Sequence, residues 1–261
     1  MIKKTRYDLR KYYKEYLTAF FAFISLMFTF FYKDQPLYLW GSILVVLISL
    51  MVFVFFRSLE KDFYFIELKN RKEKDDWIGW GDFDFDRNER CFFITNSAEG
   101  HIFSKCLNWS NYKVEFEFKI LNSCIGVIIR AGSLFNYTML QIATEGVNPH
   151  ICIMGGWKRW EHKDVFLTFA NELSLDQWYR CILVCDKENI KIRIYSSGTK
   201  LFDREWHIPR GIMSVFYENA PGETTNQKTM NYPINLEYGS FGFRNCNKEK
   251  ALIRNIIINK L

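Results

Sequence analysis

The 261-residue sequence lacks the short motifs that mark many catalytic and cofactor sites. It contains no Gly-rich loop that would cradle a phosphate, no Gly-x-Ser-x-Gly nucleophile elbow and no kinase signature. Its four histidines show neither the helical nor the finger-like spacing to cysteine that zinc sites use: His101, His150, His162 and His207. We therefore expect neither a bound metal nor another cofactor.

The sequence also lacks a disulfide framework. Its cysteines are odd in number and follow no short, regular spacing: Cys91, Cys106, Cys124, Cys152, Cys181, Cys185 and Cys246. A secreted β domain more often carries an even, paired set. We therefore expect buried, reduced thiols, as in an intracellular protein.

Charged residues are absent from two long stretches near the N-terminus, positions 16–32 and 35–56, which only Lys33 and Asp34 separate. A bilayer core about 30 Å thick needs about 20 apolar residues of helix to cross it. The first stretch is rich in phenylalanine to its end and a second stretch follows at once, which argues against a cleaved signal peptide. We predict a two-helix transmembrane hairpin with spans at 16–32 and 36–56. A core hairpin of a soluble protein is the alternative.

Basic residues predict the orientation of this hairpin. The connecting turn offers Lys33 alone, whereas the two flanks carry Lys3, Lys4, Arg6, Arg10, Lys11, Lys14, Arg57, Lys61, Lys69, Arg71, Lys72 and Lys74. Positive residues near membrane spans stay on the cytoplasmic side. We predict an integral membrane protein, of a bacterial inner membrane, with both termini in the cytoplasm. Its basic N-terminus would contact anionic lipid headgroups.

The sequence pattern changes after a charged connector at 58–76. Short runs of alternating apolar and polar residues recur from Trp77 to Leu261, which is typical of antiparallel strands. The clearest predicted strands are 114–120, 125–129, 138–143, 180–185, 190–195 and 253–258. We predict an all-β sandwich over 77–261, preceded by the connector at 58–76 and the membrane unit at 1–57. Only the segment 212–236 lacks a strand pattern, and we expect a long loop there.

Six segments, taken in order, resemble the concanavalin A-like, laminin-G-type jelly roll. The resemblance is strongest to the branch of bacterial carbohydrate-active proteins called keto-disaccharide hydrolase domains. The segments are Asn111–Phe118, Ile125–Arg130, Asn136–Ile142, Trp178–Val184, Gly239–Arg244 and Ala251–Ile258. The resemblance covers roughly the whole of 77–261 and implies two curved antiparallel sheets. It also implies a ligand on the concave face or at the loops along its rim, although the fold alone specifies no function.

Three residues on the predicted strands are candidates for a binding site. Arg130 ends a strongly apolar strand, where a charge is costly unless it meets a buried carboxylate or a ligand anion. The resemblance implies that this position lines the concave face. Tyr137 and Gln141 follow on the next predicted strand, and we expect them to share that face.

A second group of candidates lies in the segment 155–163, which places two tryptophans and several cations around a predicted turn. Aromatic faces stack on sugars or bases, and neighbouring cations suit anionic groups. The alternative is that one tryptophan fills the core while the other caps a hairpin. The predicted ligand-binding set is therefore Arg130, Tyr137, Gln141, Trp157, Arg159 and Trp160.

The carboxylates on one predicted strand give little support for catalysis. Glu115 and Glu117 share one face of a predicted strand, because side chains two residues apart point the same way. The glycosidases that this fold resembles carry acidic residues at three alternating positions, and here the third position is Lys119. We therefore expect a solvated strand face, with Phe116 and Phe118 packed inward, and no catalytic residue.

Asp82, Asp84 and Asp86 alternate in a similar way. A calcium loop of the EF-hand type would need Gly and Glu at the positions that Arg87 and Phe93 occupy. We predict no metal here, and a single calcium ion held in another way is the alternative.

The predicted function is a non-catalytic, membrane-anchored module that faces the cytoplasm and recognises a glycan-like or nucleotide-like ligand. Its partners would be the bilayer, this small ligand and further copies through the hairpin, but no nucleic-acid polymer. A cytosolic β sensor joined to two spans is also similar in layout to antiphage membrane effectors that are gated by cyclic oligonucleotides and disrupt the inner membrane. That effector is the first alternative, and a sugar-processing hydrolase is the second.

Overall fold

The computed structural model describes residues 47–48, 51, 62–67, 71–155, 158–209, 211–217, 226–232, 236–246 and 248–261. The chain divides into two units, Met1–Asp62 and Phe63–Leu261. The predicted spans at 16–32 and 36–56 lie outside the described residues, apart from the helical positions Leu47, Ile48 and Met51. No helix within the described ranges has the length and apolar character needed to cross a membrane.

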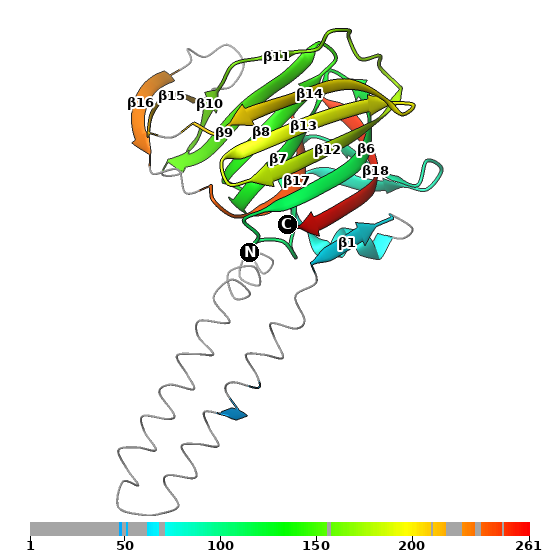
Figure 1. The fold of residues 1–261 in the computed structure, drawn as a ribbon, viewed down its shortest axis with the longest axis horizontal. Helices are drawn as coiled ribbons and strands as arrows, with labels where there is room; N and C mark the ends of the chain where they lie inside the picture. Colours follow the sequence, from blue (N-terminus) through cyan, green and yellow to red (C-terminus); the bar gives the residue numbers. More distant parts are fainter. Residues whose placement is uncertain are drawn as a thin grey trace, which may run out of the picture. The chain divides into compact units, whose positions relative to one another are not determined.

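The second unit is a sandwich of two antiparallel sheets, which confirms the predicted all-β class (Figure 1). Sheet A has the spatial order β14 (Thr199–His207), β13 (Asn189–Ser196), β12 (Trp178–Asp186), β6 (Tyr112–Asn122), β18 (Lys250–Lys260), β4 (Cys91–Thr95) and β3 (Asp82–Asp86), with β1 (Phe63–Ile66) paired to β18.

Sheet B lies behind sheet A in the view of Figure 1. Its order is β16 (Asn226–Tyr232), β15 (Gly211–Tyr217), β10 (Lys158–Lys163), β9 (Gly146–Gly155), β8 (Asn136–Ala143), β7 (Cys124–Ser133), β17 (Ser240–Asn245), β5 (Ser97–Phe103) and β2 (Trp77–Gly79), with β11 (Leu167–Thr168) paired to β9. A short 3₁₀ helix, η1 (Arg71–Asp76), precedes β2.

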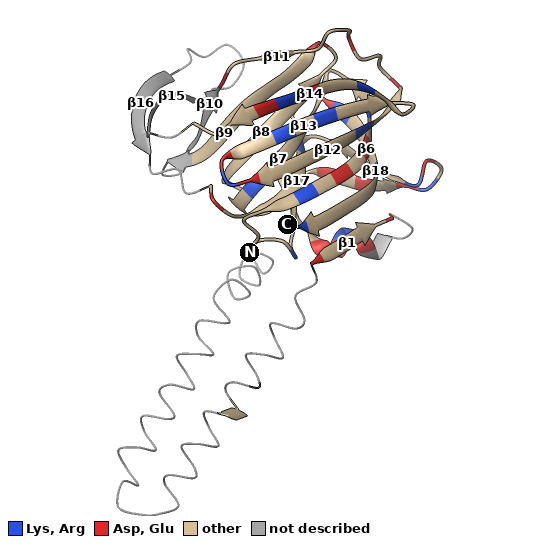
Figure 2. Cartoon of the chain, viewed as in Figure 1, with Lys and Arg blue, Asp and Glu red and all other residues tan. Residues whose placement is uncertain are grey.

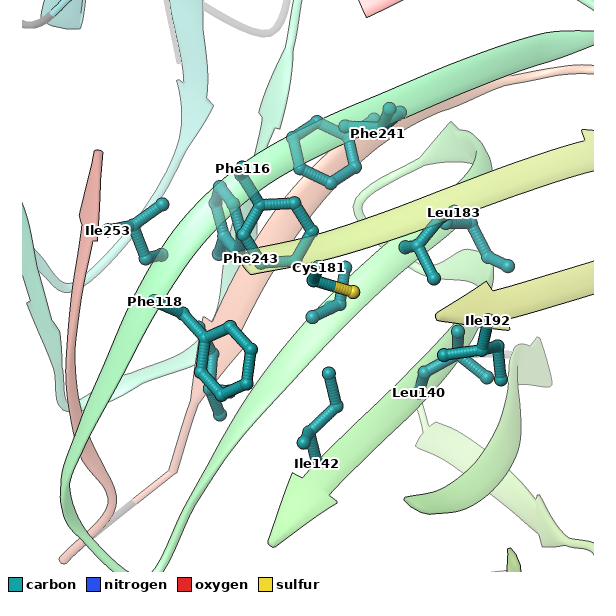
Figure 3. Close-up of a cluster of buried hydrophobic side chains, with 14 of the residues drawn as sticks. Phe116, Phe118, Leu140, Ile142, Cys181, Leu183, Ile192, Phe241, Phe243 and Ile253 are labelled. Carbon is teal, nitrogen blue, oxygen red and sulfur yellow. The ribbon is translucent and has the colours of Figure 1, made fainter. Parts of the chain in front are cut away.

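The core between the sheets follows from the alternation of the strand sequences. In β6 every second residue is buried, so Phe116 and Phe118 point inward, as predicted. The ring of Phe116 lies 5.3 Å from that of Phe243 and 5.8 Å from that of Phe241, both on β17 of sheet B (Figure 3). Aromatic contacts across the sandwich therefore join the two sheets.

The sandwich begins earlier than the predicted boundary at Trp77. β1 falls in the segment predicted as connector, and it pairs with β18 from Phe63↔Asn259 to Ile66↔Ile256. Tyr64 contacts the rings of Phe103 and Trp109, at 5.2 and 5.7 Å. This strand was not predicted, because its four consecutive apolar residues show no alternation of apolar and polar side chains. The boundary therefore moves to Phe63.

A chain that begins at Asp62 should be more stable than one that begins at Trp77. The shorter chain loses Ile66, which is buried in the core, and burial of one such side chain contributes about 1.5–3 kcal/mol. Urea denaturation of the two chains measures this difference. Equal midpoints and slopes would show that β1 adds nothing to the sandwich.

The segment 212–236 also differs from the prediction, because it is not one long loop. β15 and β16 form a hairpin with an unbroken register from Gly211↔Tyr232 to Tyr217↔Asn226. The sequence of β16, Asn-Gln-Lys-Thr-Met-Asn-Tyr, carries almost no apolar residue at alternate positions, so the pattern gave no strand signal. The pairing with β15 therefore holds this segment in the sheet, although its own sequence does not favour a strand.

The seven cysteines, all within the described residues, are thiols, as predicted. Six of them are buried and Cys246 is half-buried. Burial raises the pKa of the Cys185 thiol to about 11, although the nearby Arg130 guanidinium opposes this shift. Desolvation also raises the pKa of Cys181 well above its ordinary value. Both thiols are therefore protonated near neutral pH and serve as small apolar core groups.

Candidate functional site

Arg130 lies at an irregularity in the pairing of β7 with β8. The register is regular from Cys124↔Ala143 to Ile129↔Thr138 and then shifts before Ser133↔Asn136. Arg130 has a φ of 55°, in the left-handed region that bulges often need. Its side chain is fully buried, directly after the core residue Ile129. The bulge therefore lets an arginine enter the interior at the end of an apolar strand.

The guanidinium of Arg130 reaches from sheet B to sheet A. Its Nη2 donates to the carbonyl of Lys187, in the β12–β13 turn, and its Nη1 donates to the carbonyl of Glu237, each at 2.7 Å. It also lies 5.5 Å from the ring centre of Tyr112, whose hydroxyl accepts the Arg130 backbone N–H at 2.9 Å. Two backbone carbonyls and a tyrosine ring are therefore protein partners of the buried charge. The role of Arg130 in ligand binding stays a prediction.

An open pocket lies next to these contacts, with a volume of about 360 Å³. We call it the rim pocket, and it is lined by Ser110, Asn111, Lys187, Glu188, Ile208, Pro209, Leu236 and Glu237. These residues come from the β12–β13 turn and from the segments before β6, after β14 and before β17. Four chain segments therefore meet at one end of the sandwich.

Hydrogen bonds hold the segments of the rim pocket together. The Asn111 side chain accepts the Lys187 backbone N–H at 3.1 Å, and the Glu188 carbonyl accepts the Ile208 backbone N–H at 3.0 Å. Arg130 connects the carbonyls of Lys187 and Glu237. The pocket is therefore preformed, as most small-molecule sites are.

Gly239 allows the segment with Glu237 to pass close to Arg130. Its φ is 143°, in a region that glycine favours, and its N–H donates to the Trp109 carbonyl at 3.0 Å. A Cβ on Gly239 would lie only 2.5 Å from the backbone carbonyl carbons of Arg130 and Ala131. A side chain at this position would push the pocket wall away from the bulge.

The lining of the rim pocket combines polar and apolar groups. Ser110, Asn111 and Lys187 offer hydroxyl, amide and ammonium groups. Glu188 and Glu237 add two carboxylates, and Ile208, Pro209 and Leu236 contribute apolar surface. This composition suits a small ligand that has both hydroxyl groups and an apolar face.

A second polar cluster lies on the outer face of sheet B. Tyr137 and Gln141 share this face of β8, and Tyr137 stands opposite Cys152. The two residues were predicted to share a face with Arg130, whose side chain instead contacts the carbonyls of Lys187 and Glu237. From β17, Arg244 places its Nη1 3.7 Å from the Met139 sulfur and 3.8 Å from the Cys152 sulfur.

The accessibility of this cluster limits its use as a site. Tyr137, Cys152, Met139 and Arg244 are almost wholly inaccessible to solvent. Gln141 donates to the Glu249 carboxylate at 2.9 Å. Arg244 was not among the predicted site residues, because the segment Gly239–Arg244 indicated only the fold. The cluster is therefore buried, and the rim pocket is the more accessible candidate.

The structure describes the remaining predicted site residues only in part. Trp157 lies outside the described residues, and for Arg159 and Trp160 only the backbone is described. In the register of β10 with β9, Arg159 stands opposite Met154 and Trp160 stands opposite Ile153. Their role in ligand binding stays a prediction.

The outer face of sheet A carries charged residues of both signs, seen in Figure 2 as blue positions on β13 and as blue and red positions on β6 and β14. Glu115 contacts Arg180 at 2.7 Å and Glu117 contacts Arg254 at 2.6 Å. The Arg254 guanidinium also lies 3.9 Å from the ring centre of Trp178. The predicted solvated strand face is therefore confirmed, with both carboxylates paired to arginines.

The three aspartates of β3 also have protein partners. Asp84 contacts the Lys74 ammonium at 3.2 Å, and Asp82 accepts from the Asn96 amide at 3.2 Å. Asp86 accepts backbone N–H groups of the turn that follows β3. Within the described ranges no three His, Cys, Asp or Glu side chains are grouped so that they could hold a metal ion.

No family model matches the sequence, and no curated protein matches it. Several solved structures share its fold loosely. A protein of unknown function with a galectin-like fold from Bacillus subtilis is 13% identical, covers 76% of this chain and 94% of its own, and gives a TM-score of 0.45. A putative glycosyl hydrolase from Parabacteroides distasonis is 12% identical, and the match covers 76% of this chain and 94% of the hydrolase, with a TM-score of 0.43. Lectin II from Ulex europaeus is 9% identical, and the match covers 76% of this chain and 97% of the lectin, with a TM-score of 0.43. At these levels of similarity the chain is not assigned to a family.

Proposed function

We propose that this protein is a saccharide-recognition module that binds its ligand in the rim pocket. The carrying observation is the preformed pocket of about 360 Å³ at one end of the sandwich. A volume near the lower end of the usual range for ligand sites suits one or two sugar rings better than a long polymer. The sandwich would face the cytoplasm, and the predicted hairpin would anchor it in the membrane.

The chemistry of the lining favours a neutral saccharide. Sugar hydroxyls donate to carboxylates such as those of Glu188 and Glu237, and the C–H face of a sugar ring packs on apolar groups such as Leu236. A ligand rich in phosphate would meet two carboxylates and only one ammonium, that of Lys187. The Arg130 guanidinium does not line the pocket and already donates to two carbonyls. A cyclic oligonucleotide therefore fits the rim pocket less well.

A second candidate function, saccharide hydrolysis, rests on the same two carboxylates. Glycosidases use a pair of acidic residues on either side of the scissile bond, and both Glu188 and Glu237 line the rim pocket. Glu115 and Glu117, by contrast, are paired with arginines on the outer face of sheet A. Any hydrolysis would therefore depend on the pocket carboxylates.

Substitution of the pocket carboxylates should weaken saccharide binding. We expect Glu188→Gln and Glu237→Gln each to raise the Kd by about tenfold or more, because hydrogen bonds to charged groups contribute about 1.5–3 kcal/mol. The measurement is calorimetric titration of the full chain with neutral mono- and disaccharides that a thermal-shift screen selects. A matched control is Glu205→Gln, an exposed glutamate that contacts Lys191 on sheet A.

Two results separate the possible outcomes of this titration. If the unmodified chain releases free sugar and both Gln variants abolish turnover, the pocket is a hydrolase site. If no saccharide binds, or if both pocket variants bind as tightly as Glu205→Gln, the proposed function is wrong.

A further inference from the structure

The strand by which the chain enters the sandwich exposes large aromatic side chains. Phe63 and Phe65, at alternate positions of β1, are 53% and 47% exposed, whereas Ile66 is buried in the core. Phe65 stands opposite the half-buried Ile257 of β18. We call Phe63, Phe65 and Ile257 the entry patch. Apolar groups that gather on an otherwise charged sheet face indicate an interaction surface.

We propose that the entry patch rests in the interfacial region of the bilayer. This inference depends on the membrane anchor of the proposed function and adds a second contact between the protein and the lipid. Phenylalanine side chains at a protein surface bury favourably at the boundary between lipid headgroups and acyl chains.

The length of the connecting chain supports this partner. The second predicted span ends at position 56 and β1 begins at position 63, so six residues join them, and the seven Cα–Cα steps from 56 to 63 reach at most about 25 Å. A folded unit of about 200 residues has a radius of gyration of about 16 Å, and hence a diameter larger than this reach. An anchored sandwich must therefore keep β1 near the membrane surface.

The charges around β1 indicate which property of the membrane matters. Positions 57–76 balance six basic residues against six acidic ones: Arg57, Lys61, Lys69, Arg71, Lys72 and Lys74, against Glu60, Asp62, Glu67, Glu73, Asp75 and Asp76. A neutral segment gains little from anionic headgroups. The contact should therefore form on zwitterionic lipid and persist at high salt, because burial of apolar surface drives it.

A second copy of the chain is the competing partner, through pairing of one β1 with another. β1 has only four residues, and a short edge strand offers few backbone groups for such pairing. The exposed aromatic side chains, moreover, project from the sheet face. Lipid contact fits this geometry better.

The test uses the full chain in phosphatidylcholine nanodiscs. Phe63→Cys and Phe65→Cys are each labelled with an environment-sensitive fluorophore, and the unmodified protein reports background labelling of its own cysteines. The matched control is Val165→Cys, a 72% exposed position next to β11, at the far end of the sandwich from β1 (Figure 1). Lipids that carry a headgroup nitroxide should quench the labels at 63 and 65 severalfold more than the label at 165, at low and high salt alike.

Three results would overturn the proposal. Equal quenching at 63, 65 and 165, in a chain that resists carbonate extraction, would reject the lipid contact while the anchor stands. Crosslinks between copies through position 63 or 65, without quenching, would assign the patch to a second copy. Release of the chain by carbonate would reject the anchor and the lipid contact together, whereas saccharide titration tests the rim pocket separately.

Discussion

Replacing Arg130 with methionine should lower the free energy of unfolding by about 2–4 kcal/mol and weaken saccharide binding at the rim pocket. Methionine has a similar length but no donor, so the carbonyls of Lys187 and Glu237 would each lose a charge-assisted hydrogen bond. A partly buried acceptor left without its partner costs about 1–3 kcal/mol. The two chain segments that Arg130 connects also form walls of the pocket. Urea denaturation and saccharide titration measure the two effects.

A surface arginine is the control for this experiment. Arg193 lies on the outer face of sheet A and contacts Asp203 at 3.5 Å. Exposed pairs of this kind contribute about 0–1 kcal/mol, so Arg193→Met should change stability little and leave binding intact. If Arg130→Met is as stable as Arg193→Met, the buried guanidinium does not hold the sandwich together. If it is less stable but binds saccharide normally, Arg130 does not position the pocket.

The fold was predictable where the local sequence carries the signal. The alternation in β6 and β13 and the apolar runs in β7 and β18 are visible in the sequence, because burial of one or both sheet faces selects those residues. β1 and β16 were not predicted. β1 depends on its pairing with β18, about 190 positions away in the chain, and β16 depends on its pairing with β15. Neither strand has an alternating pattern of its own, so only the pairing partner reveals it.

The candidate site was predictable only in part, for a similar reason. Arg130 was singled out because a charge at the end of an apolar strand needs a partner. Its partners are the carbonyls of Lys187 and Glu237, 57 and 107 residues away, and any residue type can supply a carbonyl. No side-chain pattern could therefore have revealed them. The rim pocket likewise forms where four distant segments meet, so its lining shows no motif in the sequence.

Glu115 and Glu117 show the opposite case, in which the simpler interpretation was sufficient. Their spacing with Phe116 and Phe118 predicted one solvated and one buried face, and the burial pattern of β6 confirms this. Arg180 and Arg254 stand opposite Glu117 on the two neighbouring strands. Arg254 pairs with Glu117, and Arg180 pairs with Glu115. Charge pairs across neighbouring strands stabilise a sheet modestly. A chemical motif thus proved to be part of the solvated sheet surface.

Replacing Phe243 with alanine should destabilise the sandwich by about 3–5 kcal/mol, because truncation of a buried phenylalanine loses transfer free energy and leaves a cavity. Phe243 is fully buried, and its ring lies 4.8 Å from Phe241, 5.3 Å from Phe116 and 5.8 Å from Trp77. The loss would be a large share of the 5–15 kcal/mol that holds a typical domain folded. Denaturant titration of the full chain measures this loss of stability.

Leu175→Ala, at an exposed position, is the control and should change stability by less than about 0.5 kcal/mol. Phe243→Leu keeps most of the volume and should fall between the two. If Phe243→Ala matched Leu175→Ala, the aromatic contacts between the sheets would not be the core of this fold.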